Sequence, residues 1–300
     1  MAEIKGCGTA LVTPFRGGEV DYDAYAALVD RQVAGGVDFL VALATTAETP
    51  TLSAEEKVKL LQLTREHCGG LPVVVGCGSN SVPSTLANMA LLEPYGPDAW
   101  LVVVPFYNKP TQEGMYRYFS TIAQSTDKPV ILYNVPGRTG ANMSPATCLR
   151  LARDVRNIVA VKEASGRIDQ VRAILEAAPE GFSVLSGDDD MTLEMIKYGA
   201  AGVISVASNI NPSAVSKMCR KGLSAAIKAD YDADWICARD IDARLQPLFK
   251  ACFVESNPVP VKAGLSLMGL CSSEMRLPLT EATPETCDVM AGVIGLNSCV

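Results

Sequence analysis

A lysine that ends an apolar run is the residue in this chain whose position most needs explanation. Lys162 follows the apolar residues 158–161, and removing a charged ammonium from water is expensive. Burial favours the neutral amine, which can attack a carbonyl carbon and form a Schiff base. The alternative is a structural lysine that reaches out of a strand end to pair with Glu163 or a nearby aspartate.

Schiff-base chemistry also needs groups that move protons and groups that hold carboxylates. Tyr133, at the end of the preceding apolar run, can deliver a phenol beside Lys162, although it is equally a candidate core tyrosine. Thr45 and Thr46 can relay a proton or bind a carboxylate. Arg138 follows in a glycine-containing loop and can bind a substrate carboxylate through two hydrogen bonds, although many loop arginines are only solvated.

Other chemistries find little support in the remaining residues. His67 is the one histidine, so a Ser-His-Asp hydrolase or a multi-histidine metal site would have to be built around it. Its place before "CGG" predicts a helix end instead. The ten cysteines contain no C-x-x-C pair, which predicts reduced thiols rather than a disulfide framework.

Two further motifs suggest ligand sites that we do not expect. The segment "GCGSNS" has Ser81 where a dinucleotide fingerprint needs its third glycine. The three aspartates at 188–190 precede a helical pattern, and we expect them to cap that helix rather than to bind a metal.

Eight apolar runs must position the candidate residues. Each is continuous and rich in Val, Ile and Leu, as strands buried on both faces are; they span 7–15, 37–44, 72–77, 99–106, 129–135, 158–164, 182–187 and 201–208. A helical pattern follows each run, with capping-box spacing at Ser53 and Glu56 and a cap before proline at Ser144. We predict an α/β fold, a (β/α)8 TIM barrel, with an open doubly wound sheet as the alternative.

The barrel is expected to span residues 1–223, and a C-terminal helical region residues 224–300, because no strand pattern follows about Leu223. The chain has 26 basic and 33 acidic residues, a net charge of −7, and no basic run, which argues against a nucleic-acid partner. No apolar stretch approaches the ~20 residues that cross a bilayer, and the N-terminus lacks a signal-peptide layout. We therefore expect a cytoplasmic protein with no membrane partner.

Several segments, taken in order, resemble a known family. They are "GTALVTPF", "TTAE", "VVPFYNKPTQEG", "YNVPGRTG", "VAVKEASG", "LSGDD", "GVISVASN", "NPVPVKAGLSLMGL" and "RLPLTE". Together they resemble the pyruvate-dependent class I lyases of the dihydrodipicolinate synthase and N-acetylneuraminate lyase superfamily, and most closely its dihydrodipicolinate synthase branch. The resemblance covers nearly the whole chain, and "YNVPGRTG" followed by "VKE" is highly specific.

This resemblance implies a reaction and a set of residue roles. The implied reaction condenses pyruvate with L-aspartate 4-semialdehyde on the diaminopimelate route to lysine, with no metal or organic cofactor, in a homotetramer built from dimers. The implied catalytic residues are Lys162, which forms the Schiff base, and the proton-relay hydroxyls of Tyr133, Thr45 and Tyr107, the last supplied across a subunit interface. The implied substrate-binding residues are Thr46 for the pyruvate carboxylate, Arg138 for the carboxylate of the semialdehyde, and the backbone of Gly187 and Ile204.

The chain departs from the family pattern at several positions. Ala44 and Ala47 replace the two glycines of the usual Gly-Thr-Thr-Gly-Glu-Ser signature, so the loop must avoid positive φ at both. Phe106 replaces a frequent tyrosine. Lysine-inhibited relatives carry histidine and glutamate where this chain has Lys57 and Ser84, so we expect millimolar lysine to inhibit little.

Two other functions compete with this interpretation. A lyase for N-acetylneuraminate or a 2-keto-3-deoxy sugar acid would share Lys162 and Tyr133 but should lack Arg138. A non-catalytic barrel that kept only the fold would have lost the lysine or the tyrosine, and the chain retains both.

Overall fold

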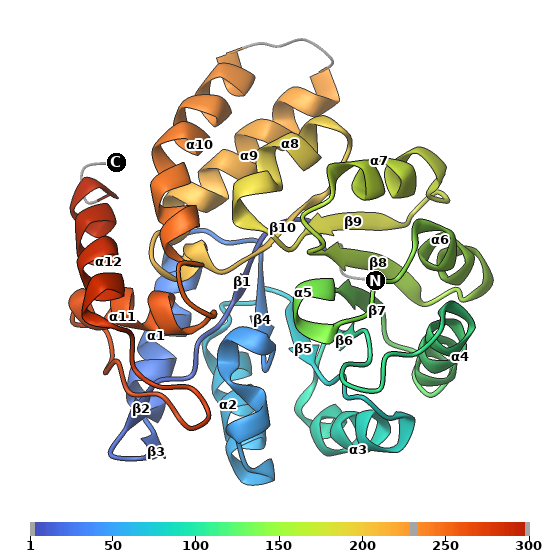
Figure 1. The fold of residues 1–300 in the computed structure, drawn as a ribbon, viewed down its shortest axis with the longest axis horizontal. Coiled ribbons are helices and arrows are strands. Elements are labelled where there is room, and N and C mark those ends of the chain that lie inside the picture. The colour runs from blue at the N-terminus through green and yellow to red at the C-terminus, as the bar shows by residue number, and fades with distance from the viewer. Residues whose placement is uncertain (1–3, 229–232, 298–300) are drawn as a thin grey trace.

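The computed structural model describes residues 4–228 and 233–297. Eight of its strands are parallel: β1 Gly6–Ala10, β4 Phe39–Ala42, β5 Val73–Gly76, β6 Ala99–Val103, β7 Val130–Asn134, β8 Ile158–Glu163, β9 Ser183–Ser186 and β10 Gly202–Ser205. They close into a barrel in the order β1-β10-β9-β8-β7-β6-β5-β4 (Figure 1). Each strand overlaps one of the eight apolar runs, so the predicted barrel is confirmed and the open sheet is excluded.

Helices surround the barrel and continue beyond it. Those between and after the strands are α1 Tyr22–Ala34, α2 Ala54–His67, α3 Val82–Leu92, α4 Gln112–Ala123, α5 Pro136–Thr139, α6 Pro145–Asp154, α7 Ile168–Ala177, α8 Thr192–Lys197 and α9 Pro212–Lys228. The C-terminal helices are α10 Ala233–Ala251, α11 Val259–Leu267 and α12 Pro284–Asn297. Both predicted caps are confirmed, since Ser53 begins α2 with a complete capping box and Ser144 caps α6.

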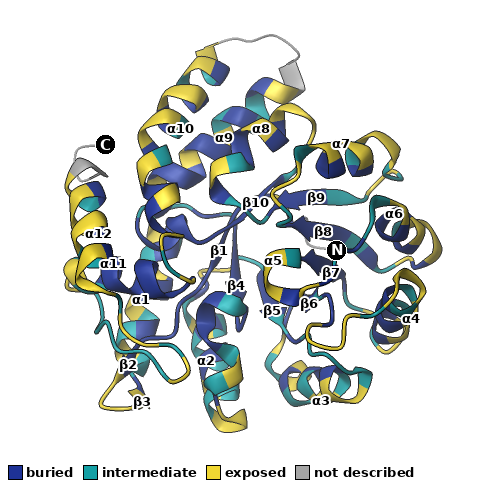
Figure 2. Ribbon diagram, in the orientation of Figure 1, coloured by how far each residue is buried: buried dark blue, intermediate teal, exposed yellow. Residues whose placement is uncertain are grey.

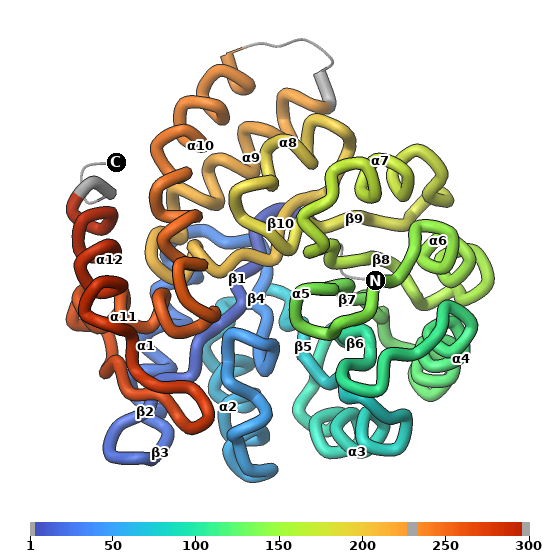
Figure 3. The backbone as a smooth tube through the Cα atoms, viewed as in Figure 1, coloured from blue at the N-terminus to red at the C-terminus, as the bar shows by residue number. Residues whose placement is uncertain are grey.

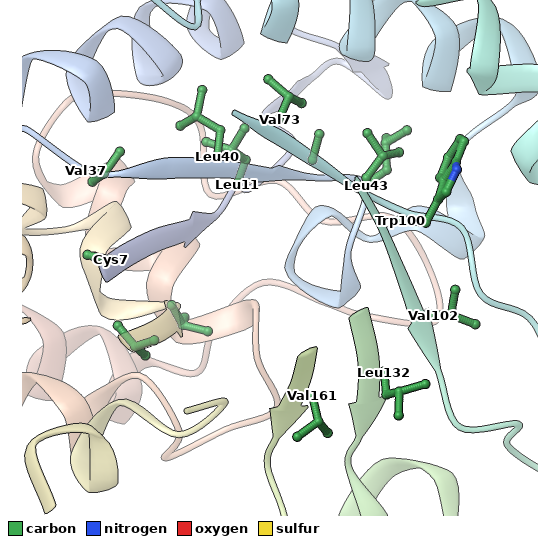
Figure 4. Close-up of a cluster of buried hydrophobic side chains, with 14 of the residues drawn as sticks. Cys7, Leu11, Val37, Leu40, Leu43, Val73, Trp100, Val102, Leu132 and Val161 are labelled. Carbon is green, nitrogen blue, oxygen red and sulfur yellow. The ribbon is translucent and has the colours of Figure 1, made fainter. Parts of the chain in front are cut away.

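Two buried clusters divide the strand residues by parity, because successive side chains point to opposite sides of a strand. The inner cluster contains no helix residue and fills the barrel; it includes Phe39, Val41, Ile131, Tyr133, Leu185 and Ile204. The outer cluster joins the strands to the helices, and Figure 4 shows part of it, including Leu40, Trp100, Val102, Leu132 and Val161. The barrel strands are accordingly buried along most of their length, while the exposed faces lie on the surrounding helices (Figure 2).

The C-terminal helices α10, α11 and α12 gather on one side of the barrel, where α10 packs against α9 (Figure 3). The expected division at 223/224 falls inside α9, which runs from Pro212 to Lys228. The end of the strand pattern does not mark the end of the last barrel helix, because that helix continues past it. A barrel followed by a separate C-terminal region stays a proposal, and the end of α9 is the better place for its boundary.

A short hairpin, β2 Phe15–Arg16 paired with β3 Glu19–Val20, was not predicted. Two-residue strands are too short to show a period. Its turn residues Gly17 and Gly18 both have positive φ, 62° and 85°, which is the backbone conformation that glycine adopts most readily.

Candidate active site

Lys162 and Tyr133 lie against each other inside the barrel. They are register partners on the adjacent strands β8 and β7, and Ala160 and Ile131, two positions earlier, both belong to the inner cluster. Lys162 is 5% exposed, and its Nζ lies 4.4 Å from the centroid of the Tyr133 ring, within the range of a cation–π contact. The alternative of a lysine reaching out of the strand end is therefore wrong.

Glu163 lies on the opposite side of β8 from Lys162 and does not pair with it. Its carboxylate is 1% exposed and accepts hydrogen bonds from Asn134 Nδ2 at 3.1 Å and Gln170 Nε2 at 3.2 Å. Burial raises the pKa of Glu163, and the hydrogen bonds to its carboxylate oppose that effect. Because Asn134 and Glu163 directly follow Tyr133 and Lys162, this network fixes the two strand ends that bear the lysine and the tyrosine.

Thr45 and Thr46 lie on a single 3₁₀ turn, Thr45–Ala47, that follows β4. Thr46 is buried, and its Oγ1 accepts a hydrogen bond from Asn257 Nδ2 at 3.0 Å. The turn begins a few residues after the last barrel-lining residue of β4, so it lies at the carboxyl end of the barrel, where catalytic residues of this fold are found.

The two alanines of this loop fit its backbone. Positive φ occurs at Leu43 and Glu48, 54° and 53°, whereas Ala44 has φ −91° and Ala47 has no positive φ. The expectation that the loop avoids positive φ at both alanines is confirmed.

A cavity of about 490 Å³ opens beside these strand ends. Thr45, Tyr133 and Arg138 line it together with mainly apolar side chains. Arg138 is exposed on the short helix α5, and its Nη2 donates a hydrogen bond to the carbonyl oxygen of Asn257 at 3.0 Å. The structure thus brings a phenol, a hydroxyl and a guanidinium around one space, and the phenol ring contacts Lys162.

Gly187 adjoins Lys162, and neither Gly187 nor Ile204 lines the cavity. A Cβ built on Gly187 would lie 2.5 Å from Ala164 Cβ and 3.1 Å from Lys162 Cε, so glycine leaves room for both side chains. Ile204 is fully buried in the barrel interior with Tyr133. Their predicted backbone contacts with substrate stay predictions.

Tyr107 lies apart from the other predicted site residues of its own chain. Its side chain is 88% exposed, and the preceding Phe106 is 39% exposed. Phe106 lines the cavity, but Tyr107 does not. The predicted proton relay through Tyr107 therefore requires a second subunit and stays a prediction.

The prediction that the aspartates at 188–190 cap a helix is wrong. Neither the 3₁₀ turn Asp189–Met191 nor α8 has a side-chain cap hydrogen bond. The Asp189 carboxylate instead accepts hydrogen bonds from the backbone N–H groups of Val206 and Ala207, both at 2.9 Å. The backbone N–H groups that bind this carboxylate follow β10, whereas the local sequence pattern predicted that it would cap the helix.

The described residues add four findings, on metals, thiols, the histidine and membranes. Within 4–228 and 233–297, no group of three or more His, Cys, Asp or Glu side chains is arranged to hold a metal ion. The nine cysteines in this part are unpaired thiols, and Cys299 lies outside it. His67 ends α2 and lies 2.9 Å from Asp30, as a helix-end residue. None of the helices described combines the length and the apolarity that a bilayer crossing demands.

Three residues that the sequence did not single out hold the site from the C-terminal region. We call Asn257, Lys262 and Arg276 the C-terminal clasp. Lys262 Nζ lies 2.6 Å from Glu48 Oε1, with both side chains fully buried, and the Arg276 backbone N–H donates to Glu48 Oε2. Burial lowers the pKa of Lys262, and the Glu48 carboxylate opposes that effect. Since Glu48 follows the Thr45–Ala47 turn, the clasp fixes the loop that bears both threonines.

The closed barrel presents a buried lysine beside a tyrosine at the carboxyl ends of its strands, where barrel enzymes of this fold place their catalytic residues. The chain matches the model of the dihydrodipicolinate synthetase family over residues 3–294. It is 46% identical to the 4-hydroxy-tetrahydrodipicolinate synthase of Thermotoga neapolitana over 295 residues, which are 97% of this chain and 98% of that relative. It is also 46% identical to the enzyme of the same name from Phocaeicola vulgatus over 296 residues, 98% of this chain and 97% of that relative.

Solved structures are similar to the same extent. A monomeric dihydrodipicolinate synthase variant superposes with a TM-score of 0.93 at 42% identity, covering 99% of this chain and 97% of that one. The dihydrodipicolinate synthase of Thermotoga maritima superposes with a TM-score of 0.92 at 42% identity, covering 97% and 99%. The chain belongs to the dihydrodipicolinate synthetase family, and it is a lyase of that family, as the sequence predicted.

Proposed function

We propose that the protein catalyses the 4-hydroxy-tetrahydrodipicolinate synthase reaction, in which pyruvate condenses with L-aspartate 4-semialdehyde on the diaminopimelate route to lysine. The observation that carries this proposal is the buried Lys162 against Tyr133. Tyr133 in turn lines one cavity with Arg138. The activity for which the relatives are named is the same. The scheme uses no metal or organic cofactor, because an iminium formed on Lys162 itself accepts electrons.

In the proposed reaction, the Lys162 amine attacks the keto carbon of pyruvate, and loss of water gives an iminium. The iminium acidifies the pyruvate methyl group, whose proton leaves through the Tyr133 and Thr45 hydroxyls as an enamine forms. The enamine carbon attacks the aldehyde carbon, and the relay returns a proton to the new alkoxide. The amino group of the second substrate then displaces Lys162 by transimination, which closes the ring and frees the lysine.

Substrate binding in this scheme depends on the two carboxylates. The Thr46 hydroxyl donates to the pyruvate carboxylate. The planar Arg138 guanidinium binds the carboxylate of the semialdehyde, which has a matching planar geometry. Holding both reactants in a near-attack geometry lowers the barrier by several kcal/mol, with a ceiling of about 7–11 kcal/mol. Arg138 also favours this reaction over cleavage of a sugar acid, for which a guanidinium at this point has no role.

We also propose that the protein is a cytoplasmic homotetramer built from dimers. The exposure of Tyr107 beside the cavity-lining Phe106 supports an assembly in which Tyr107 completes the site of a neighbouring subunit. A monomeric variant is among the similar structures, so the fold alone is compatible with more than one assembly.

Borohydride trapping tests the proposed Schiff base. Reduction in the presence of pyruvate should add one reduced pyruvate to the peptide that contains Lys162, and Lys162→Ala should abolish the adduct and lower kcat roughly a thousandfold or more. The matched control is Lys197→Ala, at an exposed position in the last turn of α8, which should keep both. Undiminished turnover of Lys162→Ala, or an adduct on another lysine, would contradict the proposal. Assays with aspartate semialdehyde and with sugar acids separate the two substrate classes.

A further inference from the structure

Asn257 touches both predicted carboxylate-binding residues at once. It lies just before α11, is 5% exposed and lines the cavity. Its side-chain Nδ2 donates to Thr46 Oγ1 at 3.0 Å, and its backbone carbonyl accepts from Arg138 Nη2 at 3.0 Å. Thr46 follows β4 and Arg138 follows β7, so one residue joins two separate strand ends.

The direction of the bond to Thr46 decides what that hydroxyl can do. A threonine hydroxyl has one proton and two acceptor lone pairs. Because the Asn257 amide donates to the oxygen, the hydroxyl proton remains free to be donated elsewhere. A hydroxyl that holds the pyruvate carboxylate must donate to it, so this direction is the productive one.

The other end of the Asn257 amide indicates that this direction is kept at some cost. Its Oδ1 is buried and accepts a hydrogen bond from no residue that the structure describes. Buried acceptors without a partner lower stability. The amide nitrogen is therefore the end of this side chain that the described residues engage, through its bond to Thr46.

The backbone carbonyl of Asn257 orients Arg138 in a comparable way. The guanidinium has five N–H donors in a fixed plane. Using one Nη2 proton on this carbonyl holds an otherwise exposed side chain, so less freedom is lost when a carboxylate binds the remaining donors. The segment that carries this carbonyl is anchored nearby, because Lys262 forms a fully buried pair with Glu48.

We propose that Asn257 is a positioning residue that presents the Thr46 hydroxyl as a donor to pyruvate through its side chain and aligns Arg138 with the second substrate through its backbone. This inference rests on the proposed function. The inference predicts different effects on the binding of the two substrates, because a change of the Asn257 side chain alters the contact with Thr46 and leaves the carbonyl that holds Arg138.

Three variants test the inference. Asn257→Asp replaces the amide donor by a carboxylate, which accepts a hydrogen bond from the Thr46 hydroxyl and repels the pyruvate carboxylate. The KM for pyruvate should therefore rise more than tenfold. Asn257→Ala only removes the donor and should raise it about three- to tenfold. In both variants the KM for aspartate semialdehyde should change less than threefold. In a Thr46→Val background, which has no hydroxyl to orient, Asn257→Ala should change the pyruvate KM less than twofold further.

The matched control makes the same substitution at the other end of the barrel. Asn157 Nδ2 donates to the carbonyl oxygens of Ala123, Thr126 and Lys128, so Asn157→Asp should lower the Tm and leave the KM for pyruvate unchanged. If it raises that KM as Asn257→Asp does, general loosening explains the effect and the inference falls. If Asn257→Asp does not fold, Asn257→Ala and its double variant decide the question.

Three other outcomes would overturn the inference. They are a pyruvate KM within twofold of wild type in Asn257→Ala and Asn257→Asp, an equal rise in KM for both substrates, and a full effect of Asn257→Ala on the pyruvate KM in the Thr46→Val background. The proposed function would still stand in these cases if the wild type traps pyruvate. Failure of the wild type to trap pyruvate and to turn over overturns the proposed function and the inference together.

Discussion

Asp188 is an acidic group whose ionisation depends on the charge of Lys162. Burial raises the pKa of Asp188 to about 6, and the Lys162 ammonium opposes this rise. Aspartates in unfolded chains titrate near pH ~3.9. Between these two values the folded chain binds more protons than the unfolded chain, so the contribution of Asp188 to stability falls as the pH rises through this window.

Replacing Asp188 by asparagine removes this titration. The free energy of unfolding of Asp188→Asn, relative to wild type, should rise by about 1–2 kcal/mol between about pH 4 and pH 7.5, a range that allows for partial exposure of the group. Urea denaturation at the two pH values measures the difference. The same difference between variant and wild type at both pH values would show that the carboxyl group does not titrate in this window.

Single residues with a local signal could be predicted from the sequence. Lys162 stands out because a charged residue ends an apolar run. Arg138 stands out because it lies in a glycine-containing loop that follows another apolar run. Asn257 has no such signal, since its bond to Thr46 joins positions 211 residues apart. Asp189 was misjudged for the related reason that its partners come from a segment beyond the helix it precedes.

At the scale of elements, the loop after β4 depends on one ion pair with the C-terminal region. Lys262 and Glu48 are both fully buried, with 2.6 Å between Nζ and Oε1. Removing one partner of a buried pair leaves an uncompensated charge, whereas removing both leaves none. The pair therefore ties the loop to α11 more firmly than its net contribution to stability would suggest.

A double-mutant comparison measures this tie. Lys262→Met should lower the free energy of unfolding by about 3–5 kcal/mol, and adding Glu48→Gln should restore part of the loss. The control is Lys128→Met, whose partner Glu93 lies 3.3 Å away at a partly exposed position and whose loss should cost about 1 kcal/mol or less. Equal losses at the two lysines, in denaturant titrations, would rule out a special role for the buried pair.

The elements themselves were largely predictable, for physical reasons. Strands buried on both faces give continuous apolar runs, and caps give the starts of α2 and α6. The β2–β3 hairpin gave no period, and the end of α9 gave no break in the pattern. Contacts between the clasp and the β4 loop could not be derived, because periodicity reports which face is buried and not what covers it.

At the scale of the whole molecule, the exposed Tyr107 makes the assembly part of the catalytic question. A tyrosine 88% exposed in its own chain can join a relay only if another subunit brings it to Lys162. In a symmetric dimer, each site would then take Lys162 from one subunit and Tyr107 from the other.

Mixing two inactive variants tests this exchange. Tyr107→Phe and Lys162→Ala homodimers should each show little activity. After mixing and reassociation in equal amounts, half of the dimers are mixed, and each has one site with both native residues, so roughly a quarter of the wild-type activity should return. Activity that stays at the level of the separate variants would place Tyr107 outside a shared site, and sedimentation analysis of the mixture confirms that mixed dimers formed.

The hairpin turn at Gly17 and Gly18 donates both backbone N–H groups to the carboxylate of Glu274, close in sequence to Arg276 of the clasp. Proteins emerge from the ribosome amino end first and fold domain by domain as they do. In a nascent chain of this protein, every barrel strand is therefore translated before the segment that secures the Thr46 loop. The threonine loop is therefore translated early, and it gains its contacts with the clasp only after residues 257–276 have left the exit tunnel.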